Sequence, residues 1–544
     1  KIRQIMKLKC KYFTSSYIIA TLAIFLSAPL YATDYWFKSV SSVYSDKSSW
    51  YLDQDRTQAA SSAPTTFDDS AYFYKMSYNE NWNNTAWVTQ VDVYIGNVIS
   101  AGGGGMQFGK ETIRDFDTPI NFQVNGKISA QICDTDSQLK INTGFDTTQG
   151  TTSAEISVGS IEVGTELFPS STAYEKYGSA TLYIDFSDSR IEESNMVVNG
   201  NINIGGGLPK GSFAELYLGV DKITVKGIID MKRNSSAWSN FYLKEASVIE
   251  CGGLNTDNVG DFTFTHTWEA RGANSTLILN NAAGTNYQFI GAIVSEGTFN
   301  SDPDSTNSVI NVVMQGGGTQ RISQGVLNKT DISGKEAGKY SVLNGKLFLD
   351  NARLRSDMRL ATLLVDGGAF GASCYDSGQT AVAYFQSAEI KNGGLLYENL
   401  TNHNIFEVGV TDKIVVEGEL SKTGAGKIFV DFTDRSGAAF DLSYYSDYIA
   451  EDVESIEFWT EILTAETLNG FNLDSADGDG IYDADSDFYA QGLENGTAVF
   501  RWVESSGNGY SLQVGFAQVP EPAFVALTIG IASIFFAARR GRRA

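Results

Sequence analysis

The sequence is poor in histidine, cysteine, proline and basic residues, and each shortage disfavours a class of function. It has 2 His, 4 Cys and 8 Pro among 544 residues. His266 and His403 belong to no paired-histidine metal motif and no nucleophile elbow, which disfavours a Ser-His-Asp hydrolase. Lys and Arg total 40 against 64 Asp and Glu, and the formal net charge of −24 repels nucleic-acid phosphates. We therefore predict a protein that is not an enzyme and binds no nucleic acid.

The cysteines are too widely separated for a disulfide framework or a zinc site. Cys10, Cys133, Cys251 and Cys374 form no CxxC pair. Cys10 falls in the N-terminal basic and apolar region. We expect the other three to be small buried hydrophobes, although their spacing leaves a single bridge open.

A short motif of alternating apolar and polar residues around a glycine recurs in the middle of the chain. Its copies span residues 122–128, 196–202, 223–229, 342–347 and 414–420, with glycines at positions 126, 200, 227, 345 and 418. Alternation predicts a strand with one buried face, and the glycine permits a bend into the next strand. The gaps between the glycines are near multiples of about 24 residues, which suits one coil of a β-helix. We predict an all-β fold with a parallel β-helix or β-solenoid body and a short C-terminal transmembrane helix.

Five regions follow from these patterns. Residues 1–32 are expected to be a signal peptide, 33–90 an N-terminal cap region rich in tryptophan, and 91–432 the solenoid repeats. Residues 433–518 are expected to form a C-terminal capping region that contains an acidic loop, and 519–544 a sorting signal. Within the capping region we expect one helix over 444–468 and a hairpin of strands 497–504 and 510–516.

The N-terminus has the three parts of a secretory signal. A basic stretch from Lys1 to Lys11 precedes an apolar run over residues 17–26, and Pro29 lies shortly before Ala32. This order predicts export by the Sec translocon and cleavage by signal peptidase after Ala32. An uncleaved membrane anchor is the alternative, although the apolar run is short for one.

The C-terminus carries a more specific pattern. Val519, Pro520, Glu521 and Pro522 precede an uncharged apolar stretch over residues 523–538, and Arg539, Arg540, Arg542 and Arg543 follow it. By the positive-inside rule the arginines stay in the cytoplasm and the body lies outside. The pattern resembles the PEP-CTERM sorting signal of bacterial exosortase substrates. This resemblance implies export across the inner membrane, transient anchoring by the tail, removal of the tail by an exosortase, and delivery to the cell surface or an exopolysaccharide matrix.

One segment of the body has a second resemblance. The turn Lys422-Thr-Gly-Ala-Gly426 precedes an alternating strand over residues 427–432. This sequence resembles the autotransporter-associated β-strand repeat, whose proteins display long β-helical regions outside the cell. No outer-membrane barrel is evident at the C-terminus, so the resemblance concerns the body alone.

An acidic run is the candidate ligand site. Asp477, Asp479, Asp483 and Asp485 alternate with small residues, and closely spaced carboxylates can wrap oxygen ligands around Ca²⁺. The run resembles the calcium loops of thrombospondin type-3 repeats and dockerins, but Ser475 stands where those loops have an early Asp. The alternative is a solvated acidic turn.

These observations leave three candidate functions. The favoured one is a secreted, surface-sorted structural or adhesive protein that associates with extracellular polysaccharide or biofilm matrix. A secreted polysaccharide lyase or hydrolase on a β-helix is the alternative, although no pair of carboxylates stands out in so acidic a chain. Ice binding is the least supported, because no sustained Thr-x-Thr ladder is present.

Overall fold

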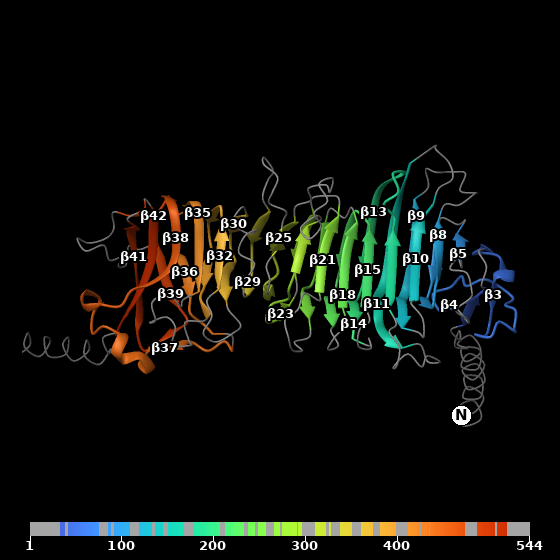
Figure 1. Ribbon diagram of the computed structural model, residues 1–544, viewed down its shortest axis with the longest axis horizontal. Helices are drawn as coiled ribbons and strands as arrows, with labels where there is room; N and C mark the ends of the chain where they lie inside the picture. Colours follow the sequence, from blue (N-terminus) through green and yellow to red (C-terminus); the bar gives the residue numbers. More distant parts are fainter. Residues whose placement is uncertain are drawn as a thin grey trace, which may run out of the picture.

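A computed structural model shows an elongated body built almost entirely of β-strands (Figure 1). It describes residues 33–38, 42–74, 85–88, 92–108, 119–132, 137–144, 151–167, 179–206, 213–232, 238–244, 248–256, 266–271, 275–290, 292–295, 310–322, 326–327, 338–350, 361–373, 381–398, 412–424, 426–434, 436–473, 487–505, 507 and 509–518. Strands succeed one another along the long axis broadly in chain order. The expectation of an all-β chain with long parallel sheets is confirmed.

A ten-stranded sheet, here called sheet B, covers the first part of the body. Its strands are β2 (Ser42–Val43), β5 (Thr85–Val88), β8 (Gly104–Phe108), β10 (Ser137–Thr143), β12 (Ala180–Asp185), β15 (Phe213–Gly219), β18 (Trp238–Lys244), β21 (His266–Arg271), β24 (Ala292–Ser295) and β27 (Val326–Leu327). Each strand pairs in parallel with the next in this order.

The largest sheet, called sheet A, has 23 strands and extends along the whole body. They are β1 (Asp34–Phe37), β3 (Trp50–Tyr51), β4 (Ser70–Tyr74), β6 (Asp92–Ile95), β7 (Asn97–Ala101), β9 (Ile120–Ile132), β11 (Thr152–Leu167), β13 (Ile191–Val198), β14 (Ile202–Gly205), β16 (Lys222–Val225), β17 (Ile229–Lys232), β19 (Val248–Cys251), β20 (Leu254–Thr256), β22 (Ser275–Leu279), β25 (Ile310–Met314), β28 (Lys339–Val342), β30 (Thr362–Val365), β32 (Val382–Phe385), β33 (Ser387–Ile390), β35 (Lys413–Lys422), β38 (Thr460–Asn469), β41 (Thr497–Ser505) and β42 (Gly509–Ala517).

A seven-stranded sheet, called sheet C, belongs to the second half of the chain. Its strands are β23 (Asn286–Phe289), β26 (Thr319–Ile322), β29 (Lys346–Asp350), β31 (Ala369–Ser373), β34 (Gly394–Leu396), β36 (Ile428–Asp431) and β39 (Phe488–Gln491). The remaining described elements are the paired strands β37 (Phe440–Asp441) and β40 (Leu493–Glu494) and the short 3-10 helices η1 (Lys47–Ser49), η6 (Leu442–Tyr448) and η7 (Val453–Ser455).

The path of one coil explains how the sheets are connected. From β12 in sheet B the chain passes through β13 and β14 in sheet A and enters the next coil at β15. Strand β12 pairs with β15, β13 with β16 and β14 with β17, so each strand lies beside its counterpart one coil further on. In later coils the third strand belongs to sheet C, where β26, β29 and β31 pair in succession.

Inward side chains from successive coils stack in columns and form the core. One column in sheet A joins Ile156 to Met196, Ile223, Ile249 and Leu277 through parallel registers. All five side chains are at most 3% exposed. Burying a side chain of this size stabilises the fold by about 1.5–3 kcal/mol. Because each coil repeats the same apolar positions, coils add to the body without enlarging the core's cross-section.

Glycines stack at the corner between the second and third strands of a coil. The Gly200 amide donates to the Gly159 carbonyl at 2.6 Å, and the Gly252 amide donates to the Gly227 carbonyl at 2.7 Å. A Cβ on Gly159 would lie 2.2 Å from the Gly126 carbonyl oxygen. These corners therefore need glycine for close approach between coils. Gly200 and Gly227 lie between two strands of a coil, as predicted, whereas Gly126 lies within β9.

The predicted coil length of about 24 residues holds for some coils only: Lys346 and Ala369, in register on neighbouring coils, are 23 residues apart, and Thr362 and Ser387 are 25 apart. Residues that hydrogen-bond across neighbouring coils are 25 apart at Asp230 and Asn255, but 40 apart at Glu155 and Asn195. The glycines of the motif are not all on neighbouring coils: β11, which contains Gly159, lies between the coils of Gly126 and Gly200. Gly418 also lies at a different corner, where its Cβ would meet the Gln386 carbonyl between β32 and β33.

Antiparallel strands and aromatic side chains close the N-terminal end. Strand β1 pairs antiparallel with β3, which interrupts the parallel ladder. The Trp50 ring is fully buried against Phe37, Tyr44 and Phe73, and its indole N–H donates to the Tyr44 carbonyl at 2.7 Å. This arrangement agrees with the expected use of the N-terminal tryptophans in a cap.

The C-terminal end confirms the predicted hairpin and corrects the predicted helix. Strand β41 pairs antiparallel with β42, which in turn pairs antiparallel with β38. Residues 444–468 do not form one helix, because η6 and η7 are short and Thr460–Asn469 is strand β38. Strand β38 buries Ile462, Leu463 and Ala465 through its pairing with β35 and β42, so the apolar residues of this segment belong to a sheet. The Lys-Thr-Gly-Ala-Gly turn expected before the strand at 427–432 lies between strands β35 and β36.

The glycine column predicts a strong effect of a single methyl group. We expect Gly159→Ala to destabilise the body by about 2 kcal/mol or more, because the new Cβ meets backbone carbonyls of the neighbouring coil that cannot move independently. The change is measured as the midpoint of thermal or urea unfolding. Gly507→Ala is the control, since a Cβ there meets nothing within 4 Å. Equal midpoints for both variants would contradict the assigned close approach.

Candidate functional site

The residues predicted to carry function from sequence lie outside the described residues. This applies to Ala32, to Val519, Pro520, Glu521 and Pro522, to Arg539, Arg540, Arg542 and Arg543, and to Asp477, Asp479, Asp483 and Asp485. Their roles in cleavage, sorting, membrane insertion and calcium binding therefore remain predictions. No group of acidic, histidine or cysteine residues suited to a metal occurs within the described ranges.

The structure brings together the two ends of the acidic run. The Asn472 amide donates to Asp487 Oδ2 at 2.6 Å, so the chain enters and leaves the run at one place. Lys422, the lysine of the Lys-Thr-Gly-Ala-Gly turn, pairs with Asp487 Oδ1. The side chains of Lys422 and Asp487 are 8% and 10% exposed. This buried pair fixes the base of the run beside the turn that follows β35.

The outward face of sheet B carries a ladder of stacked tyrosines. Tyr183, Tyr217 and Tyr242 are in register on β12, β15 and β18. Their ring centroids are 4.4 Å apart in both pairs, with interplanar angles of 12° and 14°. Lys140 occupies the same position on β10, with Nζ 5.3 Å from the centroid of the Tyr183 ring. Leu182, Leu216 and Phe241 precede the tyrosines and point into the core, which fixes the rings on the outer face.

Polar side chains flank this ladder. The Tyr217 hydroxyl donates to Glu215 Oε2 at 3.2 Å, and Asn240 Nδ2 donates to Glu215 Oε1 at 3.4 Å. Burial, reinforced by Glu215 and the neighbouring tyrosines, raises the pKa of Tyr217 well above its ordinary value. The phenol is therefore neutral at physiological pH and remains both a donor and an acceptor. The face presents a straight row of hydroxyl groups with a carboxylate and an amide beside it.

Stacking limits what the ladder can do chemically. Ring faces that contact one another cannot also stack on a ligand, so the rings expose their edges and hydroxyl groups. Aromatic pairs of this kind contribute about 0.5–1.5 kcal/mol beyond their buried area, which stabilises the coils in register. The ladder therefore serves two purposes: it fixes three coils and it orders a row of hydrogen-bonding groups.

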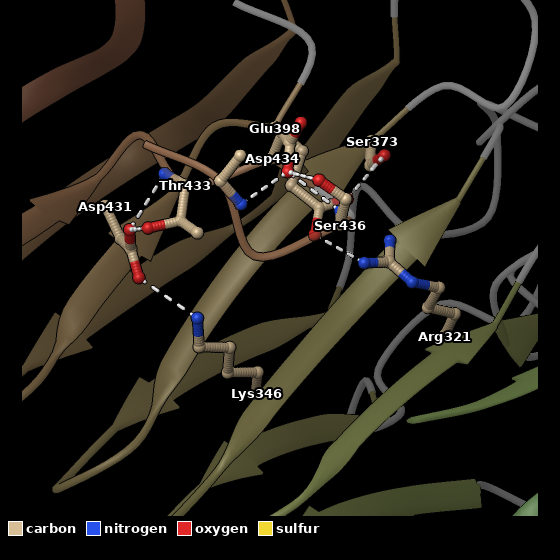
Figure 2. A network of polar contacts seen from close by, with 9 residues as sticks. Arg321, Lys346, Ser373, Glu398, Asp431, Thr433, Asp434 and Ser436 are labelled. Atoms are coloured by element: carbon tan, nitrogen blue, oxygen red, sulfur yellow. Dashed lines mark hydrogen bonds and ion pairs between the residues drawn. The ribbon is translucent and has the colours of Figure 1, made fainter. Parts of the chain in front are cut away.

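A second polar network lies on the outward face of sheet C (Figure 2). Arg321 pairs with Glu398, and the two side chains are 4% and 7% exposed. The Arg321 guanidinium lies 4.2 Å from the centroid of the Phe348 ring, while Ser373 Oγ donates to Glu398 Oε2 at 3.5 Å. Gly371 leaves room for the ring, since a Cβ there would be 2.8 Å from Phe348 Cδ1. A buried pair of this kind holds its strands in a defined arrangement.

The other half of this network surrounds Asp431. Lys346 Nζ lies 3.0 Å from Asp431 Oδ2, and both the amide and hydroxyl of Thr433 donate to Oδ1. Burial alone would raise the pKa of Asp431, but these hydrogen bonds and the Lys346 charge outweigh it and lower that pKa. Glu398 and Asp431 each have a cationic partner, whereas Asp434 accepts hydrogen bonds from Ser436 and from the Ala438 amide. The arrangement therefore stabilises strand ends and provides no poised acid or base.

Sequence reasoning missed both surfaces. The ladder had a readable signal, because the segments 180–185, 214–219 and 240–244 each place a tyrosine directly after a core residue in an alternating strand. The unequal coil lengths hid the correspondence. The sheet C network had no such signal, since Arg321 and Glu398 are 77 residues apart.

Comparisons with known proteins assign no relative. No family model, curated protein or solved structure matches the chain. In the part of the chain that the structure describes, no helix has the length and apolarity that crossing a membrane demands.

The Asp431 contacts predict a pH-dependent contribution to stability. A carboxyl whose folded pKa is lowered stabilises the protein above its ordinary pKa, near 4, and this contribution disappears as the pH falls through the folded pKa. We expect Asp431→Asn to lose about 1–2 kcal/mol of unfolding free energy at neutral pH. The difference from the unmodified protein should shrink as the pH falls below the ordinary carboxyl pKa and vanish once Asp431 is protonated in the folded state.

Urea unfolding at several pH values measures this difference. Thr433→Ser keeps the hydroxyl donor and should behave like the unmodified protein. A difference for Asp431→Asn that grows on acidification would contradict the assigned contacts.

Proposed function

We propose that the protein is a secreted, surface-sorted structural or adhesive protein whose β-solenoid body associates with extracellular polysaccharide. The observation that carries this proposal is the tyrosine ladder on sheet B, formed by Tyr183, Tyr217 and Tyr242. Neighbouring parallel strands are about 4.8 Å apart, so the hydroxyl groups form a row along the body axis. A linear polymer of hydroxyl-rich units can contact several positions of such a row together, which multiplies weak contacts.

The chemistry of the face favours a neutral polymer. Glu215 and Asp185 flank the tyrosines, and the chain carries a formal net charge of −24. Polyanions would therefore be repelled. Because the rings are already held by stacking, little side-chain entropy is lost when a ligand binds. The neutral phenols, the carboxylates and the Asn240 amide can exchange hydrogen bonds with sugar hydroxyl groups.

The proposed localisation rests on sequence patterns at the two ends of the chain. The N-terminal basic and apolar stretches support export by the Sec translocon, with cleavage after Ala32. The Val519–Pro522 motif, the apolar stretch and the terminal arginines support a transient transmembrane anchor that an exosortase removes. The finished protein would then be held at the cell surface or in the matrix, where the body meets exopolysaccharide.

Removing the ladder's hydroxyl groups tests polymer binding without removing the stack. We expect the triple variant Tyr183→Phe, Tyr217→Phe, Tyr242→Phe to bind an immobilised neutral polysaccharide about ten- to a hundredfold more weakly, since each lost hydrogen bond contributes about 1 kcal/mol. Its unfolding midpoint should change little, because the rings still stack. Tyr444→Phe, at a residue 81% exposed on the C-terminal cap, is the control. Unchanged binding of the triple variant to the polysaccharide would contradict a role of the ladder in binding.

Deleting residues 519–544 tests the proposed address separately. We expect the truncated protein to be released or retained in the periplasm, because it lacks the anchor and the exosortase motif. Surface labelling of whole cells and fractionation measure its distribution, with Val519→Ile as a conservative control. Unchanged surface display after truncation would contradict the sorting proposal.

A further inference from the structure

A second cluster of polar side chains lies on the outward face of sheet A near the N-terminal end. Lys127, Ser129 and Gln131 alternate along β9 and point outward, because Ile128 and Ala130 between them fill the core. The Lys127 ammonium lies 2.9 Å from Glu162 Oε2 and 2.8 Å from Glu166 Oε2. We call these residues, with Thr165, the Lys127 cluster.

An irregularity in β11 creates this cluster. Val163 pairs with Ala130, but the next register pair is Leu167 with Ile132, so β11 has extra residues opposite β9. Gly164 adopts a φ of +64° at this point, a conformation that favours glycine. The resulting bulge lets Glu166 reach both Lys127 and Gln131 Nε2, which is 3.1 Å from Glu166 Oε2. Bulges that redirect side chains are common beside functional sites.

Three buried polar atoms of the cluster lack a partner among the described residues. They are Ser129 Oγ, Gln131 Oε1 and Thr165 Oγ1. Ser129 is fully buried and Gln131 is 8% exposed. Buried polar groups in folded proteins are almost always hydrogen-bonded. These two hydroxyl groups and this amide oxygen lie on strand segments beside the Lys127 ion pairs, and they require water or a ligand of matching chemistry.

An aromatic pair borders the cluster. Tyr72, Ile99 and Ser129 occupy the same register position on three neighbouring strands, because Tyr72 pairs with Ile99 and Ile99 pairs with Ser129. Tyr72 stacks on Trp36 with ring centroids 4.4 Å apart, and its hydroxyl hydrogen-bonds the Asp34 carboxyl. The combination of aromatic surface, carboxylates, an ammonium, an amide and hydroxyl groups on one face is chemistry suited to sugars.

We infer that the Lys127 cluster binds a single neutral sugar unit through its hydroxyl groups. Sugar hydroxyls both donate and accept, as Ser129, Thr165 and Gln131 require. Two glutamates against one lysine leave the cluster negative, which disfavours uronic acids and sulfated sugars. The inference deepens the proposed function by naming a second contact that holds one unit of the polymer, and rests on it only for the class of ligand. The cluster and the tyrosine ladder are on different sheets and are changed by different variants.

Two substitutions test the site in the full-length protein. Ser129→Ala removes a hydroxyl without a partner, so a merely structural role predicts unchanged or greater stability and unchanged binding. Glu166→Gln removes the carboxylate that Lys127 and Gln131 share. Glu155→Gln, at an exposed position on the same strand, is the matched control. Binding is measured by calorimetry or ligand-observed NMR with neutral oligosaccharides and with galacturonic acid oligomers.

We expect the unmodified protein and Glu155→Gln to bind a neutral oligosaccharide, with at least tenfold weaker binding for Ser129→Ala and Glu166→Gln. The triple phenylalanine variant should keep this binding. Equal binding by all variants, preference for galacturonic acid, or a crystal soaked in sugar that shows only ordered water over Ser129 would overturn the inference. If the triple phenylalanine variant loses polymer binding while Ser129→Ala and Glu166→Gln keep it, the proposed function stands and the inference is wrong.

Discussion

The close approach of one coil to the next is the constraint on which the rest of the structure depends. Parallel strands lie beside their counterparts because backbone hydrogen bonds join each coil to its neighbours, and the glycine corners allow the turns to stack at the same spacing. A side chain at Gly159 would force two coils apart. Because the register is fixed at these corners, every outward position is repeated along the axis at the spacing of the strands.

This repetition explains both proposed binding surfaces. On sheet B the repeat is regular, and the same outward position gives the stacked ladder of Tyr183, Tyr217 and Tyr242. On sheet A the repeat is interrupted by the bulge at Gly164, which directs Glu166 toward a neighbouring strand. Ser129 Oγ nearby has no partner among the described residues. A regular row suits an extended polymer, whereas an irregular cluster suits one unit of it. The sheet C network differs from both, because Glu398 and Asp431 already have cationic partners.

Much of the fold could be predicted from the sequence, since alternation and glycine act over a few residues. The strands around Gly126, Gly200 and Gly227 and the terminal hairpin were found this way. The coil length could not be found, because loops of very different length separate identical corners, and a period requires equal spacing. The helix expected over 444–468 is wrong for a related reason. The mixture of acidic and apolar residues in this segment is compatible with either a helix or a strand, and pairing of β38 with β35 favours the strand.

The functional surfaces were largely hidden from the sequence. The ladder depends on which residue lies beside which across coils, and that register is a property of the stacked backbone. The Lys127 cluster depends on a bulge that brings Glu166 to Lys127 across 39 residues. The proposed terminal signals, by contrast, are contiguous in the sequence, but they would specify an address and not an activity.

Oxidative footprinting of tyrosine side chains tests the central claim most directly. The protein is exposed to hydroxyl radicals with and without a neutral polysaccharide, and modification is quantified at each tyrosine by mass spectrometry. The account predicts that polymer protects Tyr183, Tyr217 and Tyr242 while Tyr444, on the C-terminal cap, is modified equally in both states. Protection at Tyr444 with no change along sheet B would contradict it.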